Sequence, residues 1–284
     1  MSVNRKAVLV ETFNAAGQNH LGLLAAGVAF YMFFAIIPGL GVAVWLLGLL
    51  TNPAAIQGEA DNLRDVLPQE ALSLIQQQLI ALTSRQSGGV SLPGLINLVI
   101  ALFTARTAAS SMIEALNHVY GVQETRGIIK VNAIAVLFTI VAVITLVAAI
   151  MLAILLPELH RFASSSGPLQ VLVRYLRWPL LAFLAILALA VVYRFGPDRE
   201  KPSWHWLTWG SIAAASLWLV VSFGFSWYVA VFNSYDRLYG SLGAVIVLLF
   251  WFWLTAFSGL LGAQLDRQIE LQSGQKAQNA INRA

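Results

Sequence analysis

Residues 103–120, FTARTAASSMIEALNHVY, combine an arginine with other polar side chains at helical spacing, directly after an apolar run. On a helix that turns by about 100° per residue, Glu114, Asn117 and Tyr120 all lie within about 80° of Arg106. Arg106 and Glu114 are separated by about 12 Å along the helix axis, so they are not expected to pair with each other. A guanidinium, an amide and a phenol on one face are groups that can bind an anionic head group or solute.

Two interpretations of Arg106 remain open from the sequence. In the first, Arg106 marks the point where a helix leaves the bilayer, and its guanidinium reaches the interface while the rest of the segment lies at the membrane surface. In the second, the face through Arg106 and Asn117 borders a polar cavity at the inner end of a helical bundle, because ionisable residues within spans are functional candidates.

The composition places these residues in a membrane protein. Of the 284 residues, 58% are hydrophobic and only 11% are charged, whereas soluble domains carry about 25% charged residues. The net charge of +4 is expected to report membrane topology rather than nucleic-acid binding. The chain has no cysteine, which excludes disulfides, thiolate metal sites and cysteine nucleophiles.

The residues needed for hydrolytic or cofactor chemistry are not grouped in the sequence. Histidine occurs only at positions 20, 118, 160 and 205, with no zinc-protease spacing. The pair Asp61 and Asp65 resembles a solvated helix face more than a metal site. No phosphate-binding or dinucleotide-binding motif is present. We therefore expect no enzyme activity, no cofactor and no metal.

The elements that must position the polar face are transmembrane helices, and we expect a single all-α bundle over residues 1–270. A span needs about 20 largely apolar residues. Lys and Arg are concentrated on the segments that put both termini in the cytoplasm. An alternative with five spans treats the short segment 178–195 as re-entrant. The six expected spans are 21–50, 88–109, 131–156, 178–195, 204–232 and 240–265.

Two segments outside the spans also have a pattern. Residues 68–82, PQEALSLIQQQLIAL, place leucine and isoleucine at helical spacing between Gln and Glu. This pattern predicts an amphipathic helix within an outer loop, 51–87. Residues 271–284 are rich in Gln, Asn, Lys and Arg and are expected to form a cytoplasmic tail.

Small and breaking residues within the spans suggest packing or hinge positions. Pro38 lies in the middle of the first span and is expected to kink it and free the carbonyl near Phe34. Pairs of small residues four apart, such as Gly210 and Ala214, let membrane helices approach closely. The hinge and packing candidates are Pro38, Gly39, Gly41, Gly240, Gly243 and Gly262.

Three segments together resemble the YihY/BrkB family of bacterial inner-membrane proteins. They are NHLGLLAAGVAFYMFFAIIPGL, TARTAASSMIEALNHVYGVQETRG and DRLYGSLGAVIVLLFWFWLTAFSGLLGAQL. The resemblance extends from about residue 10 to residue 270. It implies a six-span helical bundle in the bacterial inner (plasma) membrane with cytoplasmic termini. The chain departs from the family at Gln264, where members commonly carry Glu.

The resemblance also bears on function. Members have been called ribonuclease BN, a label now regarded as a misassignment, and others are linked to serum resistance or envelope lipid traffic. We expect a transporter or translocation factor for an anionic or amphiphilic envelope component, either a lipid or a small solute. The alternative is a non-transporting scaffold for envelope integrity. The expected partners are the lipid bilayer and an anionic lipid or solute, with no nucleic acid.

The candidate residues follow from this expectation. Arg106, Asn117, Tyr120 and Arg126 would line the cytoplasmic entrance, with Tyr31 and the Pro38 kink beside the path. The full set of binding or transport candidates is Arg106, Glu114, Asn117, Tyr120, Arg126, Tyr31, Asn97, Tyr239 and Gln264.

Overall fold

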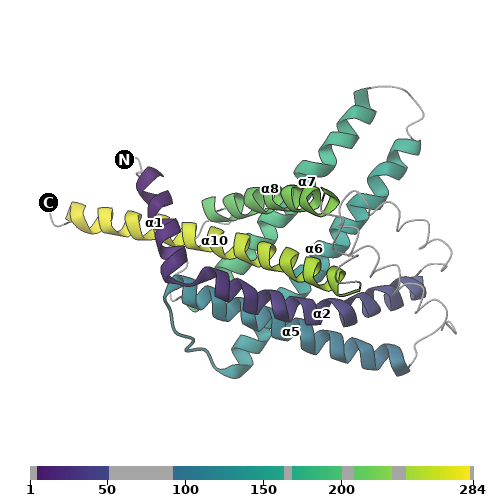
Figure 1. The fold of residues 1–284 in the computed structure, drawn as a ribbon, viewed down its shortest axis with the longest axis horizontal. Coiled ribbons are helices and arrows are strands. Elements are labelled where there is room, and N and C mark those ends of the chain that lie inside the picture. The colour runs from purple at the N-terminus through teal and green to yellow at the C-terminus, as the bar shows by residue number, and fades with distance from the viewer. Residues whose placement is uncertain (1–4, 51–91, 163–167, 200–207, 232–240, 282–284) are drawn as a thin grey trace.

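The structure is a computed structural model that describes residues 5–50, 92–162, 168–199, 208–231 and 241–281 (Figure 1). Every regular element in these ranges is an α-helix. The helices are α1 (Arg5–Gln18), α2 (Leu21–Leu50), α5 (Leu92–Tyr120), α6 (Ile128–Phe162), α7 (Pro168–Phe195), α8 (Trp209–Val231) and α10 (Ser241–Ile281). The expected fold class, an all-α membrane helical bundle, is confirmed.

Five of these helices are long and apolar enough to cross a bilayer. The apolar stretches are Leu21–Gly39 in α2, Gly94–Tyr120 in α5, Ile128–Thr145 in α6, Trp209–Val229 in α8 and Val245–Ser273 in α10. The remaining predicted span, 178–195, corresponds to Pro179–Phe195 of α7, an apolar stretch that is shorter than the other five.

The helices differ from the sequence prediction at several ends. A separate helix, α1, precedes the first span, and α10 continues well beyond residue 265 to Ile281. Between α1 and α2, His20 has a φ of 49°, a left-handed conformation for which histidine is enriched among non-glycine residues. The predicted loop helix within 51–87, as well as Tyr239 and Gly240, lie outside the described residues.

The long helices pack as a ring in the described part of the chain (Figure 1). Each of α2, α5, α6, α7, α8 and α10 contacts the next one in that order, and α10 contacts α2 to complete the ring. Helix α5 also contacts α10 across the ring, while α1 packs on α10 and touches α2. The two marked chain ends lie on the same side of the molecule (Figure 1).

Small residues allow the helices to approach closely within the bundle. Ala25 of α2, Leu116 of α5, Ala214 of α8 and Leu260 of α10 belong to one buried cluster. At Gly262 of α10, an added Cβ would lie 2.5 Å from the Cβ of Ala214. This contact is of the kind through which small residues bring membrane helices together.

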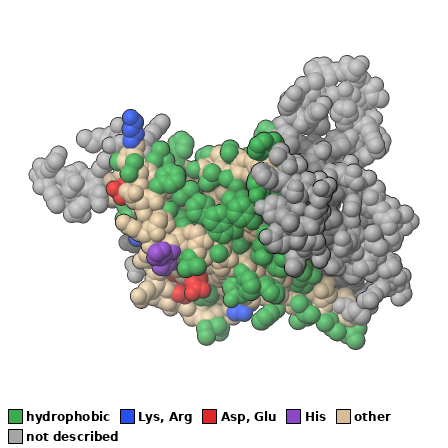
Figure 2. All heavy atoms as spheres, in the orientation of Figure 1, with side chains coloured by type: hydrophobic (Ala, Val, Ile, Leu, Met, Phe, Trp, Pro, Cys, Tyr) green, Lys and Arg blue, Asp and Glu red, His purple; other side chains and the backbone are tan. Residues whose placement is uncertain are grey.

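The outside of the bundle is strongly apolar. Large side chains such as Phe103 of α5, Ile144 of α6 and Trp227 of α8 are more than half exposed. Figure 2 shows hydrophobic side chains over the middle of one face, with most charged and histidine side chains toward the end that carries α1. A surface of this kind is suited to lipid contact, because its side chains are apolar and the backbone polar groups are hydrogen-bonded within the helices.

Candidate functional site

A layer of paired polar side chains lies where α5 and α7 end, beside residues 266–270 of α10. Its members come from the end of α5, the connectors that follow α5 and α7, and α10. We call it the polar layer; it consists of Asn117, Tyr120, Glu124, Arg126, Asp198, Arg199, Asp266, Arg267 and Glu270.

Arg126 is the centre of the first half of the layer. Its Nε and Nη2 donate to the two carboxylate oxygens of Glu124, each at 2.6 Å. Its Nη1 and Nη2 also donate to the backbone carbonyls of Phe195 at 3.2 Å and Gly196 at 2.8 Å. The Arg126 side chain is only 7% exposed. One guanidinium therefore ties the α5–α6 connector to the end of α7.

Asn117 links the two connectors from the last turn of α5. Its Nδ2 donates to Glu124 at 2.8 Å, and its Oδ1 accepts from the backbone N–H of Asp198 at 2.8 Å. The Asp198 carboxylate in turn accepts hydrogen bonds from the hydroxyl and the backbone N–H of Thr125. Asn117 is buried, and both the N–H and the oxygen of its side-chain amide are hydrogen-bonded within the protein.

Hydrogen bonding stabilises the ionised carboxylates of this half. The hydrogen bonds from Arg126 hold the pKa of Glu124 below its usual range. The hydroxyl and N–H of Thr125 likewise lower the pKa of Asp198. Both groups lie in connectors outside the apolar spans, and both are expected to be charged at neutral pH.

Arg199 is the centre of the second half of the layer. Its guanidinium carbon lies 4.3 Å from the centre of the Tyr120 ring, a cation–π contact. Its Nη1 donates to Glu270 of α10 at 3.0 Å, and its Nη2 donates to the carbonyl of Tyr193 at 2.9 Å. Arg267 of α10 donates to the carbonyl of Val119 near the end of α5. The cations therefore satisfy carbonyls at two helix C-termini, where the helix dipole favours positive charge.

The end of α5 has a Schellman motif that turns the chain toward Glu124. The N–H of Val122 donates to the carbonyl of Asn117, and the N–H of Gly121 donates to the carbonyl of His118. Gly121 has a φ of 66°, the left-handed conformation that favours glycine.

Asp266 of α10 caps the N-terminus of α8. Its Oδ1 accepts a hydrogen bond of 2.7 Å from the backbone N–H of Gly210, at the start of α8. A carboxylate is favourable at this position, because the N-terminus of a helix carries partial positive charge. The side chain is buried, so α8 and α10 are joined by a polar contact inside the bundle.

Gln264 lies deeper in the bundle and joins α10 to the turn before α2. It is fully buried, and its Oε1 accepts a hydrogen bond of 2.9 Å from Nδ2 of Asn19. Within the part of the chain that the structure describes, its Nε2 has no hydrogen-bond partner.

The structure brings some sequence candidates together and separates others. Asn117, Tyr120 and Arg126 belong to the polar layer, whereas Glu114 of the same α5 segment is exposed. Arg106 is half-buried, and its Nε donates to Oδ1 of Asn132 on α6 at 3.1 Å. Arg106 thus joins α5 to α6 in a hydrogen bond that neither sequence interpretation included.

The candidates near the predicted kink lie apart from the polar layer. Helix α2 continues through Pro38, and Nδ2 of Asn97 on α5 lies 3.5 Å from the Pro38 carbonyl. Tyr31 is 40% exposed on α2. An added Cβ at Gly39 would meet nothing within 4 Å, while Gly41 continues α2 and Gly243 is buried in the first turn of α10.

Sequence reasoning missed the charged partners from the other segments, Asp198, Arg199, Asp266, Arg267 and Glu270. A signal was present in Asp266 and Glu270, because two acidic residues four apart lie on the same face of a helix, with Arg267 next to Asp266 in the sequence. Among the described residues, no three His, Asp or Glu side chains are grouped so that they could hold a metal ion.

Comparison with known proteins gives a consistent set of relatives. A family model described as "Virulence factor BrkB" matches residues 12–284. The ribonuclease-like protein YfkH of Bacillus subtilis is 28% identical over 250 residues, which cover 85% of this chain and 87% of YfkH. A UPF0761 membrane protein of Xanthomonas campestris is 28% identical over 249 residues, which cover 85% of this chain but only 55% of that protein. No solved structure matches the chain.

Proposed function

The chain belongs to the virulence factor BrkB family, and we propose that it is a translocation factor for an anionic or amphiphilic component of the cell envelope. In this proposal it works in the bacterial inner membrane with six spans and cytoplasmic termini. The UPF0761 relatives are named membrane proteins, and the chain spans about half the length of the Xanthomonas relatives that it matches. The substrate is a lipid or small solute that carries negative charge.

The six-span topology is supported by the arrangement of the helices. The two chain ends lie on the same side of the molecule (Figure 1), an arrangement that fits an even number of crossings. The apolar stretch of α7 takes part in the ring between α6 and α8. The excess of Lys and Arg on the terminal side favours the cytoplasm for that side.

The observation that carries the proposal is a ring of helices that ends in a layer of paired charges. The layer joins three segments that are far apart in the chain, and its pairs include Arg126 with Glu124 and Arg199 with Glu270. An anionic group would have to displace the carboxylates to reach these guanidinium groups, because the Arg126 and Arg199 side chains are 7% and 14% exposed while those of Glu124 and Glu270 are 30% and 38% exposed. It could replace a carboxylate as their partner, since phosphate and carboxylate suit the same guanidinium geometry.

In this mechanism the polar layer is the closed form of the cytoplasmic entrance. Asn117, Tyr120 and Arg126 hold the entrance shut through the contacts described above. A substrate anion that draws the Arg126 guanidinium away from Glu124 and from the Phe195 and Gly196 carbonyls would release the α5–α6 connector from α7. Arg106 keeps α5 and α6 together through Asn132. The pairing energy is modest, because exposed partners such as Glu124 gain little from a salt bridge in water, and such a contact can open reversibly.

A scaffold without transport activity is the second candidate. It is favoured by the degree to which the polar layer is satisfied, since Arg126 alone donates to one carboxylate and two backbone carbonyls. A static layer of this kind would fix the ends of α5 and α7 and present a rigid surface. Transport measurements distinguish the two candidates, because only the first predicts substrate movement.

The name of YfkH suggests ribonuclease activity as a third possibility. The described residues offer this activity no support, because no group of three metal-binding side chains is present among them. Incubation of the purified protein with RNA, with and without a divalent cation, tests it directly. Cleavage that persists through repurification would replace the translocation proposal.

The translocation proposal is tested with purified protein in vesicles of phosphatidylethanolamine and phosphatidylglycerol that contain fluorescent phosphatidylglycerol. A membrane-impermeant reductant destroys the fluorescence of the outer leaflet, so movement between leaflets appears as additional loss. Protein-containing vesicles should lose more fluorescence than empty ones, and Arg126→Gln should change the rate. Lys130→Gln removes a nearby exposed cation and should leave the rate unchanged. A small anionic fluorophore trapped inside the vesicles tests the solute form of the proposal.

Two outcomes would contradict the proposal. Loss equal to that of empty vesicles for both probes, with folded protein present, would favour the scaffold. Equal rates for the wild-type protein and Arg126→Gln would remove the polar layer from the mechanism.

A further inference from the structure

Helix α1 is placed differently from the other helices. It has 14 residues, which span about 21 Å and fall short of a bilayer crossing. It stands across the direction of α2 and α10 at the end of the bundle (Figure 1). Its main contact is with α10.

Helix α1 has three faces with different surroundings. Val8, Thr12 and Ala16 are spaced four residues apart and are buried. The large apolar side chains of Leu9, Val10 and Phe13 are 52%, 58% and 65% exposed. The rest of the helix surface carries Glu11, Asn14 and Gln18, which are exposed and polar.

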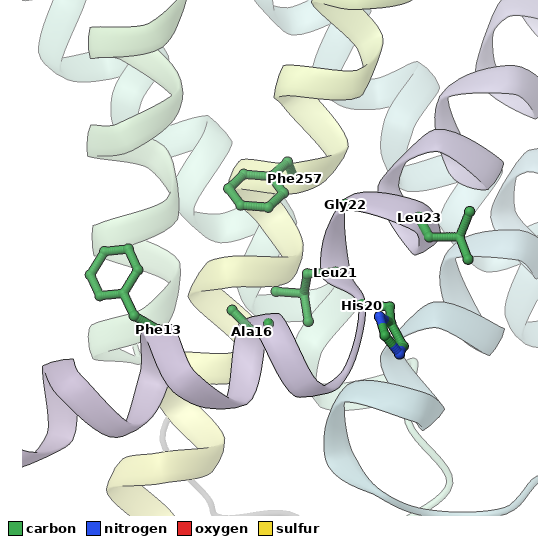
Figure 3. Close-up of a pocket in the computed structure, with 8 residues that line it drawn as sticks. Phe13, Ala16, His20, Leu21, Gly22, Leu23 and Phe257 are labelled. Atoms are coloured by element: carbon green, nitrogen blue, oxygen red, sulfur yellow. The ribbon is translucent and has the colours of Figure 1, made fainter.

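An apolar groove lies beside the exposed stripe. It has a volume of about 440 Å³. It is lined by Phe13, Ala16, Gly17, His20, Leu21, Gly22, Leu23 and Phe257. Figure 3 shows Phe13 rising from α1 on the side on which Phe257 lies, with Ala16 between Phe13 and Leu21. Phe257 belongs to the apolar span of α10, and Leu21 and Leu23 begin the span of α2. The groove therefore opens from α1 toward the part of the bundle that lies in lipid.

We propose that α1 lies in the head-group boundary of the leaflet on the side of the chain termini, and that the groove holds an acyl chain of a phospholipid from that leaflet. At the end of a membrane bundle, a helix with exposed apolar and exposed polar side chains can bury the apolar ones at the acyl boundary and keep the polar ones among the head groups. Two walls of the groove belong to membrane spans, so in this proposal the groove opens onto the hydrocarbon of the bilayer.

The charges around the stripe fit an anionic head group. Lys6 is exposed, and on a helix it lies about 20° from Phe13 and about 40° from Val10. A lysine among exposed apolar side chains can extend its ammonium to the phosphate level while its stem stays in the apolar layer. The acidic Glu11 is about 140° away from Lys6, on the polar face. The position of α1 does not depend on whether the protein transports anything.

The position of α1 can be tested by site-specific labelling. The chain has no native cysteine, so a thiol-reactive label attaches only at the cysteine that is introduced. Nitroxide labels at Leu9→Cys, Val10→Cys and Phe13→Cys report the stripe, and Glu11→Cys and Gln18→Cys are matched controls on the polar face. The protein is placed in vesicles of phosphatidylethanolamine and phosphatidylglycerol. Labels on the stripe should collide with oxygen, which concentrates in the membrane, and the controls should collide with a water-soluble nickel complex. Equal access of the nickel complex to all five positions would overturn the proposal.

The groove is tested separately with lipids that carry bromine on the acyl chain. A fluorophore at Val10→Cys should be quenched, and Gly17→Leu should lower the quenching about two-fold by filling the groove. An added Cβ at Gly17 meets nothing within 4 Å, so this variant should fold. Unchanged quenching in Gly17→Leu would show that no acyl chain enters the groove. Dipolar coupling between Phe13 labels on two copies, with no oxygen access, would instead assign the stripe to a contact between copies and overturn the proposal.

Discussion

Arg126 holds both carboxylate oxygens of Glu124, with Nε and Nη2 each at 2.6 Å. The same guanidinium donates to the carbonyls of Phe195 and Gly196 at the end of α7. The contact therefore joins two connectors that are about 70 residues apart in the chain. Its geometry depends on the planar fork of arginine, which lysine does not have.

Replacing Arg126 by glutamine is expected to destabilise the protein by about 1–3 kcal/mol, because charge-assisted hydrogen bonds and two carbonyl caps are lost together. Arg126→Lys should recover only part of this, since it keeps the charge but loses the fork. The measurement is the free energy of unfolding in detergent micelles, followed by tryptophan fluorescence. Lys130→Gln is the control, and a loss of the same size there would show that general charge, not the pairing, is responsible.

Stability should fall on acidification through the lowered pKa values of Glu124 and Asp198. A folded-state pKa below the unfolded value means that the unfolded chain binds more protons at low pH. The contribution is therefore fully present above the ordinary carboxyl pKa values, which are near 4.5 and 3.8, and is lost as pH falls through the lower folded values. Thermal unfolding between pH 3 and 7, a range set by these carboxyl groups, measures it.

The variant Glu124→Gln separates this effect from general acid denaturation. Its unfolding temperature should be lower at neutral pH and should depend less on pH than that of the wild-type protein. Parallel curves for the two proteins would contradict the assignment to Glu124.

Replacing Gly121 by alanine is expected to cost about 1–2 kcal/mol for the left-handed backbone alone. The added Cβ would also lie 2.5 Å from Nη2 of Arg267, so Arg267 would have to leave the Val119 carbonyl. Gly127→Ala is the matched control in the same connector, because a Cβ there meets nothing within 4 Å. Equal unfolding free energies for the two variants would contradict the role assigned to Gly121.

The helices themselves could be predicted from the sequence because apolar length and helical period are local properties. The first span was predicted at 21–50, and α2 runs from Leu21 to Leu50. Helix α1 was missed because Glu11, Asn14 and Gln18 break the apolar run, and the buried face of α1 is made by small or polar residues such as Thr12 and Ala16. Such a face can be recognised only against the helix on which it packs.

The polar layer could be predicted only in part. The period of α5 placed Asn117 and Tyr120 near its end, but their partners Asp198 and Arg199 come from a distant segment. Nothing local in the sequence says which charge meets which. The same holds for Arg106, whose partner Asn132 lies 26 residues away on α6.

The close approach of α8 and α10 gives the last prediction. Replacing Gly262 by alanine would place a Cβ 2.5 Å from the Cβ of Ala214 and from the carbonyl oxygen of Gly210, and 2.7 Å from the Tyr193 hydroxyl. Two of these neighbours are fixed by helix geometry, so α8 and α10 must separate, at a cost of about 1–3 kcal/mol. Gly259→Ala, nearly one turn earlier on α10, brings its Cβ no nearer than 3.9 Å to Leu189 and should be neutral or slightly stabilising, because alanine has the higher helix propensity. Unfolding free energies in micelles measure the contrast. If Gly262→Ala were as stable as Gly259→Ala, the two helices would not be in contact at this point, and the ring would be open between α8 and α10.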